Sequence, residues 1–471
     1  MPFAKQPHPE TLVSLANATP RPFWLDTPDR PEPIPALTTT ITADLAIIGA
    51  GFTGLWTALL AKEQQPDRDV VLIEADECAS GATGRNGGFV AASITHGFEN
   101  GLSRWPDEMK QLIALGQANL NAIGDAVQRY AIACDWQRSG ELLVATEPYQ
   151  VESLKDLMQR STPYGEDWTW LDQEQLRAEV NSPLYLGGLY GHDVAMVDPT
   201  RLAWGLRRAC LDLGVRLFER TPAIGLAQAA RAMSVRTPYG AIRANKVALA
   251  TNAYPPLIKR LKFYIVPVYD YVLVTEPLSV GQRDSIGWQQ RQGISDAGNQ
   301  FHYYRTTADG RIVWGGYDAV YYRGDGMGQQ YDQNADSFGR LAEHFFATFP
   351  QLRGLRFTHA FGGAIDTCSR FSPFWGTTHG GRVAYALGYT GLGVGASRFG
   401  AQVMLDLLDK RDTERTGLEM VKSKPFPFPP EPFRSPIINF TRWSLDQADR
   451  HAGQRNLWLR TLDKLGLGFD S

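Results

Sequence analysis

The segment that most constrains this chain is residues 44–74, DLAIIGAGFTGLWTALLAKEQQPDRDVVLIE. The glycine pattern G-x-G-x-x-G at 49–54 follows a short apolar run, and a second apolar run at 70–73 leads to Glu74. This order predicts a buried parallel strand, a tight turn, a helix and a second strand. The start of such a helix binds phosphate through its free N–H groups. We therefore predict a dinucleotide site, the alternative being a glycine-rich turn in an ordinary α/β domain.

Glu74 indicates which dinucleotide fits this unit. It stands 20 residues after Gly54, where an acid accepts hydrogen bonds from ribose hydroxyls and disfavours a 2′-phosphate. FAD or NAD therefore fits better than NADP. The residues predicted to bind the cofactor through this unit and through later strand ends are Gly49, Gly51, Phe52, Thr53, Gly54, Glu74, Ala75, Ala223, Ala250, Thr251 and Asn252.

Two further glycine-rich loops favour FAD over NAD. Residues 80–88, SGATGRNGG, bring backbone close to a flat or charged group, and their polar side chains suit a pyrophosphate and a flavin ring. Residues 388–395, GYTGLGVG, precede a helix whose N-terminus favours the negative charge of a reduced flavin. Three backbone loops suit the length and the flat ring of FAD. The loop residues predicted to contact it are Gly81, Ala82, Thr83, Gly84, Arg85, Asn86, Gly87, Gly88, Gly388, Thr390, Gly391, Leu392, Gly393 and Val394.

The bulk composition argues against several classes of protein. A net charge of −3 over 471 residues gives no basic field for nucleic acid or an anionic membrane. The four cysteines are far apart, so we expect free core thiols in a reducing compartment and no metal site. The chain shows neither the apolar run of a signal peptide nor 18 uninterrupted apolar residues. We expect a cytoplasmic protein without a transmembrane segment, and contact with a membrane through an electron-transfer partner stays compatible.

Alternating apolar residues predict a second sheet of different character. Residues 265–275, 302–305 and 311–314 alternate with period two, and the Asp-Gly pair at 309–310 predicts a hairpin turn between the last two. A hairpin-like strand pair is also expected at 136–146. The result is a mostly antiparallel sheet, a natural substrate platform beside the nucleotide-binding domain.

Several of these motifs together resemble those of a known family. GAGFTG, SGATGRNGG, VDPTRL, ALATNAY, DGRIVWGG and GYTGLGV occur in the same order in FAD-dependent amine and amino-acid oxidoreductases, the D-amino-acid oxidase, glycine oxidase and sarcosine oxidase group. The resemblance spans about residues 42–410, and the second and third glycine loops look most like those of γ-glutamylputrescine oxidase. It implies oxidation of a C–N bond, with hydride passing from the carbon next to the amine nitrogen to flavin N5 and the imine then hydrolysing.

The resemblance also implies a fold and a division of the chain. We expect an α/β (mixed α+β) chain with a Rossmann-like FAD-binding domain of the glutathione-reductase type and a second, mostly antiparallel β-sheet substrate domain. Strands near 247 and 383 return to the first sheet. The predicted parts are an N-terminal arm with docked aromatics at 1–40, the FAD-binding domain at 41–100, 195–262 and 355–410, the substrate domain at 101–194 and 263–354, and a C-terminal tail with a helix at 411–471.

Departures from the family pattern point to the substrate. The family's carboxylate-binding arginine falls at Ile365, and the carboxylate-binding lysine of sarcosine oxidases falls at Gly395. Because a desolvated carboxylate needs such a cation, an amine, polyamine conjugate or secondary amine fits better than an amino acid. The oxygen-activating lysine falls at Val313, so oxygen or another electron acceptor, and hence oxidase or dehydrogenase, stays open. The cysteine for covalent attachment falls near Gly363 and not at Cys368, so we expect non-covalent FAD.

The substrate side offers four candidate catalytic residues, Tyr269, Tyr271, Asp366 and Tyr389. Either tyrosine of the platform strand can cap the substrate over the flavin, and plain aromatics on one sheet face are the alternative. Asp366 is a candidate for binding a substrate ammonium, with a turn-capping aspartate as the alternative. Tyr389 is expected on the substrate side of the flavin. Arg85 is assigned to an FAD phosphate, with a substrate acid as the alternative.

Two other functions stay open from the sequence. One is an amino-acid oxidase or dehydrogenase of the glycine, sarcosine or D-amino-acid type, with its carboxylate anchor relocated to Arg85 or Arg305. The other is a non-catalytic FAD-binding electron-transfer subunit. We expect a small-molecule amine as substrate and no nucleic-acid partner, while the sequence does not define the amine or the oligomeric state.

Overall fold

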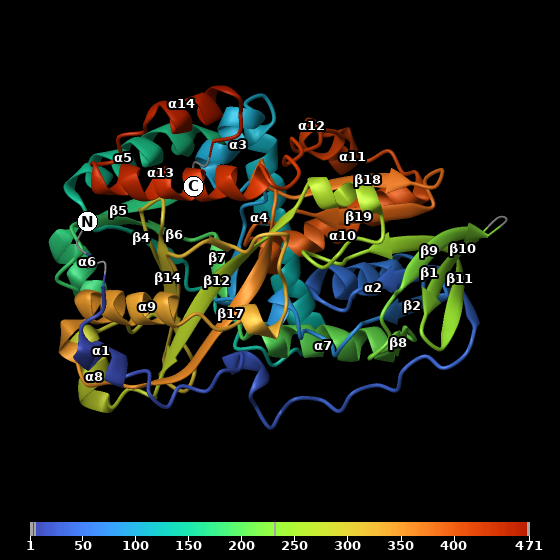
Figure 1. The fold of residues 1–471 in the computed structure, drawn as a ribbon, viewed down its shortest axis with the longest axis horizontal. Coiled ribbons are helices and arrows are strands. Elements are labelled where there is room, and N and C mark those ends of the chain that lie inside the picture. The colour runs from blue at the N-terminus through green and yellow to red at the C-terminus, as the bar shows by residue number, and fades with distance from the viewer. Residues whose placement is uncertain (1–2, 4–5, 230–231, 469–471) are drawn as a thin grey trace.

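Two large β-sheets organise the computed structural model, which describes residues 3, 6–229 and 232–468 (Figure 1). The first sheet has the order β18-β19-β11-β1-β2-β8. Its four strands β11, β1, β2 and β8 pair in parallel, as do β11 and β19, while β9 and β10 extend it as antiparallel strands. The bounds are β1 Ile41–Ile48, β2 Val70–Ile73, β8 Arg216–Phe218, β9 Gly225–Ala229, β10 Ala232–Thr237, β11 Gly240–Leu249, β18 Phe374–Thr378 and β19 Val383–Leu387.

β1 is buried on both faces, which is why its sequence is a nearly continuous apolar run. Leu45 and Ile47 pack with helices α2 (Phe52–Gln64) and α10 (Gly393–Asp409) in one core cluster. Ala46 and Ile48 point to the opposite face, where a second cluster covers the sheet. The predicted strand, glycine turn, helix and strand of residues 44–74 are all present.

The second sheet has the order β16-β12-β15-β14-β13-β4-β6-β5, with β17 also paired to β12. Helix α9 (Ala335–Thr348) covers one of its faces, with Phe338 edge-on to Tyr271 and Phe345 edge-on to Trp314. The bounds are β4 Glu141–Ala145, β5 Trp168–Asp172, β6 Gly187–Gly191, β12 Val266–Thr275, β13 Gly293–Asp296, β14 His302–Thr306, β15 Ile312–Gly316, β16 Val320–Tyr321 and β17 Phe357–Thr367.

Two predicted boundaries are corrected by strand pairing. β17 pairs with β12 from Val266↔Thr367 to Thr275↔Phe357, so it belongs to the second sheet and not to the FAD-binding domain. The expected hairpin at 136–146 contains only β4, which pairs with β6 and β13. The segment before β4 forms no second strand. Its residue Gln137 instead forms an isolated antiparallel bridge with Met196 of β7 (Val194–Met196).

Helix α4 (Met109–Arg129) is also placed differently from the prediction, which assigned it to the substrate domain. Its residues Leu112, Leu120 and Ile123 lie in the core cluster shared with α2 and α10. The other helices are α3 Phe98–Arg104, α5 Pro148–Ser161, α6 Gln173–Glu179, α7 Pro199–Asp212, α8 Val280–Ile286, α11 Glu414–Gly417 and α12 Glu419–Lys422, and the short strands β3 Phe89–Ala91 and β7 Val194–Met196 pair with each other. No helix among the described residues is long and apolar enough to cross a membrane.

The N-terminal segment runs from helix α1 (Pro9–Val13) along the lower side of both sheets in Figure 1. Its Trp24 is buried and donates a hydrogen bond from Nε1 to the backbone oxygen of Asn86 at 2.8 Å. The Thr200 hydroxyl donates in turn to the backbone oxygen of Trp24 at 2.8 Å. The arm is thereby fixed to the second glycine-rich loop and to the start of α7.

The C-terminal tail forms two helices, α13 (Arg434–Arg450) and α14 (Leu457–Lys464), which lie above the second sheet in Figure 1. Asp449 fixes α13 by accepting hydrogen bonds from the backbone N–H groups of Asn299 and Gln300. Glu431, just before α13, accepts a hydrogen bond from the Tyr321 hydroxyl at 3.0 Å. The tail is therefore docked on the substrate sheet.

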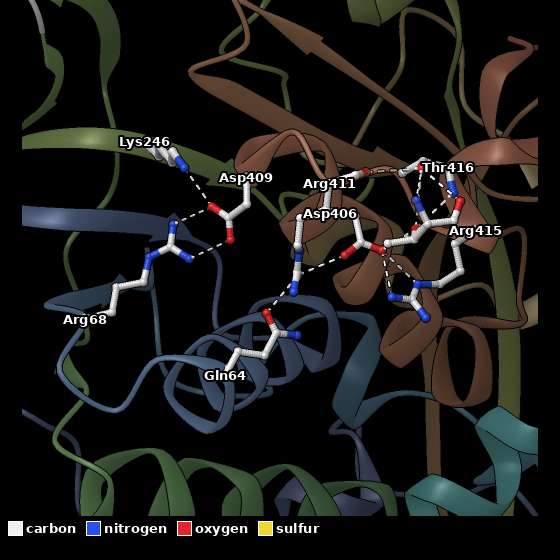
Figure 2. Close-up of polar contacts among 9 residues, drawn as sticks. Gln64, Arg68, Lys246, Asp406, Asp409, Arg411, Arg415 and Thr416 are labelled. Carbon is white, nitrogen blue, oxygen red and sulfur yellow. Dashed lines mark hydrogen bonds and ion pairs between the residues drawn. The ribbon is translucent and has the colours of Figure 1, made fainter.

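Two buried or half-buried aspartates anchor the C-terminal end of α10 (Figure 2). Asp409 accepts from Lys246 of β11 at 2.7 Å and from Arg68, just before β2, at 3.3 Å. Asp406 is fully buried and pairs with Arg411 at 2.8 Å and Arg415 at 2.7 Å. Because α10 is one rigid helix, these contacts also fix its N-terminal end, which lies at the third glycine loop.

We predict that Asp406→Asn lowers the free energy of unfolding by about 2–4 kcal/mol, because it removes the counter-charge of two arginines from a buried site. Thermal and urea denaturation would measure the loss. The exposed Asp412, three residues after Asp409, gives the matched control Asp412→Asn, which should leave the midpoint unchanged. Equal midpoints for both variants would show that the Asp406 pairs contribute no net stability.

Candidate active site

The first glycine turn is a place where three backbones touch. Gly49 follows β1 with φ of +105°, a conformation that favours glycine. A Cβ at Gly49 would lie 2.5 Å from the backbone oxygen of Ala250, and a Cβ at Gly54 would lie 1.8 Å from the oxygen of Gly49. The turn thus brings the start of α2 against the ends of β1 and β11, and no side chain fits between them.

Glu74 lies at the end of β2, beside this turn. Its carboxylate accepts hydrogen bonds from the backbone N–H of Ala50 at 2.7 Å and of Asp76 at 3.1 Å. Burial raises the pKa of Glu74, and these backbone hydrogen bonds oppose that rise. The Thr221 N–H donates to the backbone oxygen of Glu74 at 2.7 Å. The predicted residues Ala75 and Ala223 follow Glu74 and Thr221 in the chain and belong to this edge of the sheet.

The second loop, residues 80–88, lies over the start of α2. The Thr83 hydroxyl accepts the N–H of Phe52 at 3.1 Å, and a Cβ at Gly51 would approach the same oxygen to 2.9 Å. Asn86 holds the loop together, because its amide donates to the backbone oxygen of Thr83 and accepts from the N–H of Gly88, each at 2.8 Å. The predicted Gly81, Ala82, Gly84 and Gly87 lie in this same loop.

Arg85 connects the loop to the second domain. Its guanidinium pairs with Asp332 at 2.6 Å and donates to the backbone oxygens of Gly362 at 3.0 Å and Ser80 at 3.1 Å. Asp332 was not singled out in the sequence, where it reads as the start of a helix. The guanidinium of Arg85 is therefore already paired with a protein carboxylate, so fewer of its N–H groups can bind an FAD phosphate or a substrate carboxylate.

The third glycine loop is held by Asp366 of β17. The carboxylate accepts the N–H of Gly388 at 2.6 Å, and the Asp366 backbone oxygen accepts the N–H of Thr390 at 3.3 Å. Burial raises the pKa of Asp366 to about 7. A nitrogen of the His96 ring lies 3.0 Å from the oxygen of Thr390, and burial lowers the pKa of His96 to about 4, so this ring is neutral at pH 7. These contacts match the turn-capping alternative for Asp366.

Helix α10 begins within the third loop. Leu392 is its N-cap, and Gly393 and Val394 form its first turn. Gly391 has φ of +95° and faces open space, with no atom within 4 Å of a Cβ built there. A Cβ at Gly395 would lie 2.3 Å from the oxygen of Ala91. The exposed Gly391 therefore leaves space beside the start of α10, whose first N–H groups have no partner within the helix.

Three of the four candidate catalytic residues are tyrosines, and the structure buries all three. Tyr389 lies in the core beside α2 and α10, where a Cβ at Gly400 would be 2.2 Å from its hydroxyl. The Tyr271 hydroxyl lies 2.7 Å from that of Tyr322, and Tyr269 packs in the same cluster under α9. Their packing contacts are compatible with the alternative of plain sheet and core aromatics, and their catalytic roles stay predictions.

The opposite face of β12 points toward the glycine loops. Asp270 is on that face, and its carboxylate accepts a hydrogen bond from the Tyr303 hydroxyl at 2.5 Å. The Tyr303 ring lies against the second loop, 2.8 Å from a Cβ built at Gly87. Asp270 was missed in the sequence, although a lone carboxylate in the apolar run VYDYVLV is a detectable signal.

The remaining sequence predictions concern cysteines, metals and strand ends. All four cysteines are buried and free, and the Cys368 thiol donates to the backbone oxygen of Ser372 at 3.1 Å. No group of three or more potential metal ligands occurs among the residues described. Ala250, Thr251 and Asn252 lie at the end of β11, where the Ala250 N–H donates to the oxygen of Ile48 at 2.9 Å.

Comparison with known proteins agrees with this geometry. Residues 44–407 match the family described as FAD dependent oxidoreductase, or DAO, and the chain therefore belongs to that family. A γ-glutamylputrescine oxidoreductase of Escherichia coli strain K12 is 30% identical over 83% of this chain and 89% of that protein. A probable oxidoreductase OrdL of Haemophilus influenzae is 27% identical over 82% and 88%. Among solved structures, glycine oxidase from Geobacillus kaustophilus has a TM-score of 0.67 at 17% identity, covering 79% of this chain and 96% of that one.

The predicted family, fold class and FAD cofactor are confirmed, and the residues present fit that cofactor. A Cβ at Gly49 or Gly54 would meet a backbone oxygen at the predicted dinucleotide turn, and the Glu74 carboxylate lies beside this turn, so these residues are compatible with a dinucleotide. Gly391 is exposed and leaves space beside the start of α10, which is compatible with the predicted position of the flavin. The chain is an FAD-dependent oxidoreductase.

We predict that Gly54→Ala strongly reduces FAD retention. The new Cβ would lie 1.8 Å from the backbone oxygen of Gly49, so α2 must move away from the turn. Overpacking of this kind costs about 1–3 kcal/mol, which corresponds to about 5–150-fold weaker binding. The ratio of flavin absorbance to protein absorbance after purification measures how much FAD the variant retains. The control is Gly281→Ala in the exposed helix α8, where a Cβ meets no atom within 4 Å; a full flavin content in both variants would contradict the assigned turn.

Proposed function

We propose that this protein oxidises the C–N bond of an amine, a polyamine conjugate or a secondary amine, and does not act on α-amino acids. The observation that carries the proposal is that both arginines available as relocated carboxylate anchors are already occupied. Arg85 pairs with Asp332. Arg305 lies 1% exposed behind the second loop, donating to the backbone oxygen of Val197 at 2.5 Å.

The two family positions for a carboxylate anchor support the same proposal. Ile365 on β17 is partly exposed and carries no charge. Gly395 has no room for a lysine, because even a Cβ would approach the oxygen of Ala91 to 2.3 Å. An α-carboxylate placed in this site would therefore lose water without gaining a cation, which costs several kcal/mol.

The protein's own residues bind and orient the reactants. The glycine turn at 49–54 and Glu74 would hold the dinucleotide part, and the loop at 80–88 and the start of α10 would contact the rest of the cofactor. When bound, FAD supplies the hydride acceptor for the carbon next to the amine nitrogen. We propose a non-covalent cofactor, because the one thiol near the third loop, Cys368, is buried and hydrogen-bonded to Ser372. Buried free thiols also favour a reducing compartment such as the cytoplasm.

The first test is an anaerobic bleaching screen of the yellow holoenzyme. We expect γ-glutamylputrescine, other polyamine conjugates or secondary amines to bleach the flavin absorbance, and glycine, sarcosine and D-alanine to leave it unchanged at equal concentration. Bleaching by the amino acids alone would contradict the proposal. Purified protein without releasable flavin would contradict the assignment of the cofactor itself.

The electron acceptor is tested on the same reduced sample. Val313 is fully buried among apolar side chains, including Val272 and Phe361, at the position of the family's oxygen-activating lysine. We therefore expect slow reoxidation in air and fast reoxidation by an added dye, as in a dehydrogenase. Val313→Lys is the informative variant, because a gain in the rate with oxygen would show that this position controls oxygen reactivity. Rapid air oxidation of the wild-type protein would show that it is an oxidase.

A further inference from the structure

Asp270 is a carboxylate without a cation in the seam between the two domains. On β12 it lies between Tyr269 and Tyr271, but its side chain points to the opposite face, toward the second glycine loop. Its oxygens accept hydrogen bonds from the Tyr303 hydroxyl at 2.5 Å, the Tyr271 N–H at 2.8 Å and the Gly316 N–H at 3.1 Å. All three donors are neutral.

The other carboxylates near the glycine loops already have partners that account for them. Asp332 pairs with Arg85 at 2.6 Å. Asp366 accepts the N–H of Gly388 and caps the third loop. Among the residues that the structure describes, no lysine, arginine or histidine forms an ion pair with Asp270. A desolvated carboxylate of this kind is stabilised by a positive charge, and the described part of the chain does not pair one with Asp270.

Asp270 lies at the junction of the second sheet with the loop at 80–88. Asp270 and Tyr303 remain partly exposed although they lie inside the molecule. Both residues pair with glycines on neighbouring strands. Asp270 of β12 is opposite Gly363 of β17, and Tyr303 of β14 is opposite Gly315 of β15. A Cβ at Gly363 would come within 3.1 Å of the Arg85 side chain, so this part of the sheet faces the loop at 80–88 directly. Asp270 therefore lies next to the flavin-binding loop and not on the outer surface.

We propose that Asp270, oriented by Tyr303, binds the positively charged nitrogen of the amine substrate and accepts the proton that this nitrogen must lose before hydride leaves the adjacent carbon. This inference rests on the proposed function and names the group that recognises its substrate class. Burial raises the pKa of Asp270 to about 6, so the carboxylate is still ionised at neutral pH. Tyr303 is a positioning residue: its hydroxyl fixes one carboxylate oxygen, and its ring packs against the loop at Gly87. Selectivity then comes from an anion that attracts amines and repels carboxylates.

The test uses a cation that cannot be oxidised. In tert-butylammonium the carbon next to nitrogen carries no hydrogen, so it reports binding without turnover, and tert-butanol is its neutral counterpart of nearly the same shape. We expect isothermal titration of the FAD-loaded protein to show binding of the ammonium and much weaker binding of the alcohol. Asp270→Asn should weaken binding of the ammonium about 10–100-fold and leave the alcohol unchanged. Tyr303→Phe should weaken it less, with the alcohol again unchanged.

The matched control is Asp318→Asn, which removes another buried carboxylate of the same region, one that is paired with Arg340. This variant should bind the ammonium like the wild type. Wild-type affinity in a flavin-containing Asp270→Asn protein would overturn the inference. If that variant does not hold flavin, Tyr303→Phe decides, and unchanged ammonium binding in it overturns the inference as well.

The result is independent of the bleaching screen. Suppose that ammonium binding depends on Asp270 but that only amino acids reduce the flavin. The cation site at Asp270 would then be supported, and the proposed function would be contradicted. If amines bleach the flavin but Asp270→Asn leaves ammonium binding unchanged, the proposed function would be supported and the role of Asp270 would be contradicted.

Discussion

The contact on which the rest of this structure depends is the meeting of three backbones at the first glycine turn. Gly49 touches Gly54 of α2 and Ala250, the residue after β11, so closely that a methyl group at either glycine would collide with a carbonyl oxygen. This close packing aims the start of α2 at the space in which a pyrophosphate binds, and it fixes β11 beside β1. Buried apolar residues on both faces of β1 then hold the turn in place.

The second glycine loop connects the cofactor to the substrate side. It contacts α2 through Thr83, the N-terminal arm through the oxygen of Asn86, and the second sheet through Arg85 and the ring of Tyr303. A single nine-residue segment therefore contacts both domains at once. The ion pair of Arg85 with Asp332 adds a charged contact that is only partly exposed, and contacts of this kind keep their strength better than surface pairs do. The proposed substrate specificity follows from this arrangement, because the same arginine is no longer available for a substrate carboxylate.

Much of the cofactor site could be predicted from the sequence because glycines at this spacing occur mainly where backbone must pass close to backbone or to a ligand. The pattern at 49–54, the acid at 74 and the two later glycine loops predicted the FAD cofactor that the family confirms. The substrate side was harder. Period-two alternation places Tyr269 and Tyr271 together on one face of β12, but it does not tell which face meets the cofactor. That depends on α9, which packs on the tyrosine face and leaves Asp270 on the other. The domain boundary near 355 failed for a related reason, since the pairing of β17 with β12 is non-local.

Figure 1 shows the first sheet built from strands at both ends of the colour range, blue for β1 and orange for β19. This discontinuity has a consequence for how the protein matures in the cell. The dinucleotide turn is synthesised early, whereas the third glycine loop and α10 leave the ribosome only after the whole substrate sheet has been made. A nascent chain can therefore offer a phosphate-binding turn without the helix that faces the flavin. We therefore expect cofactor capture to be complete only after residues up to 409 have docked, so that FAD stabilises the finished chain.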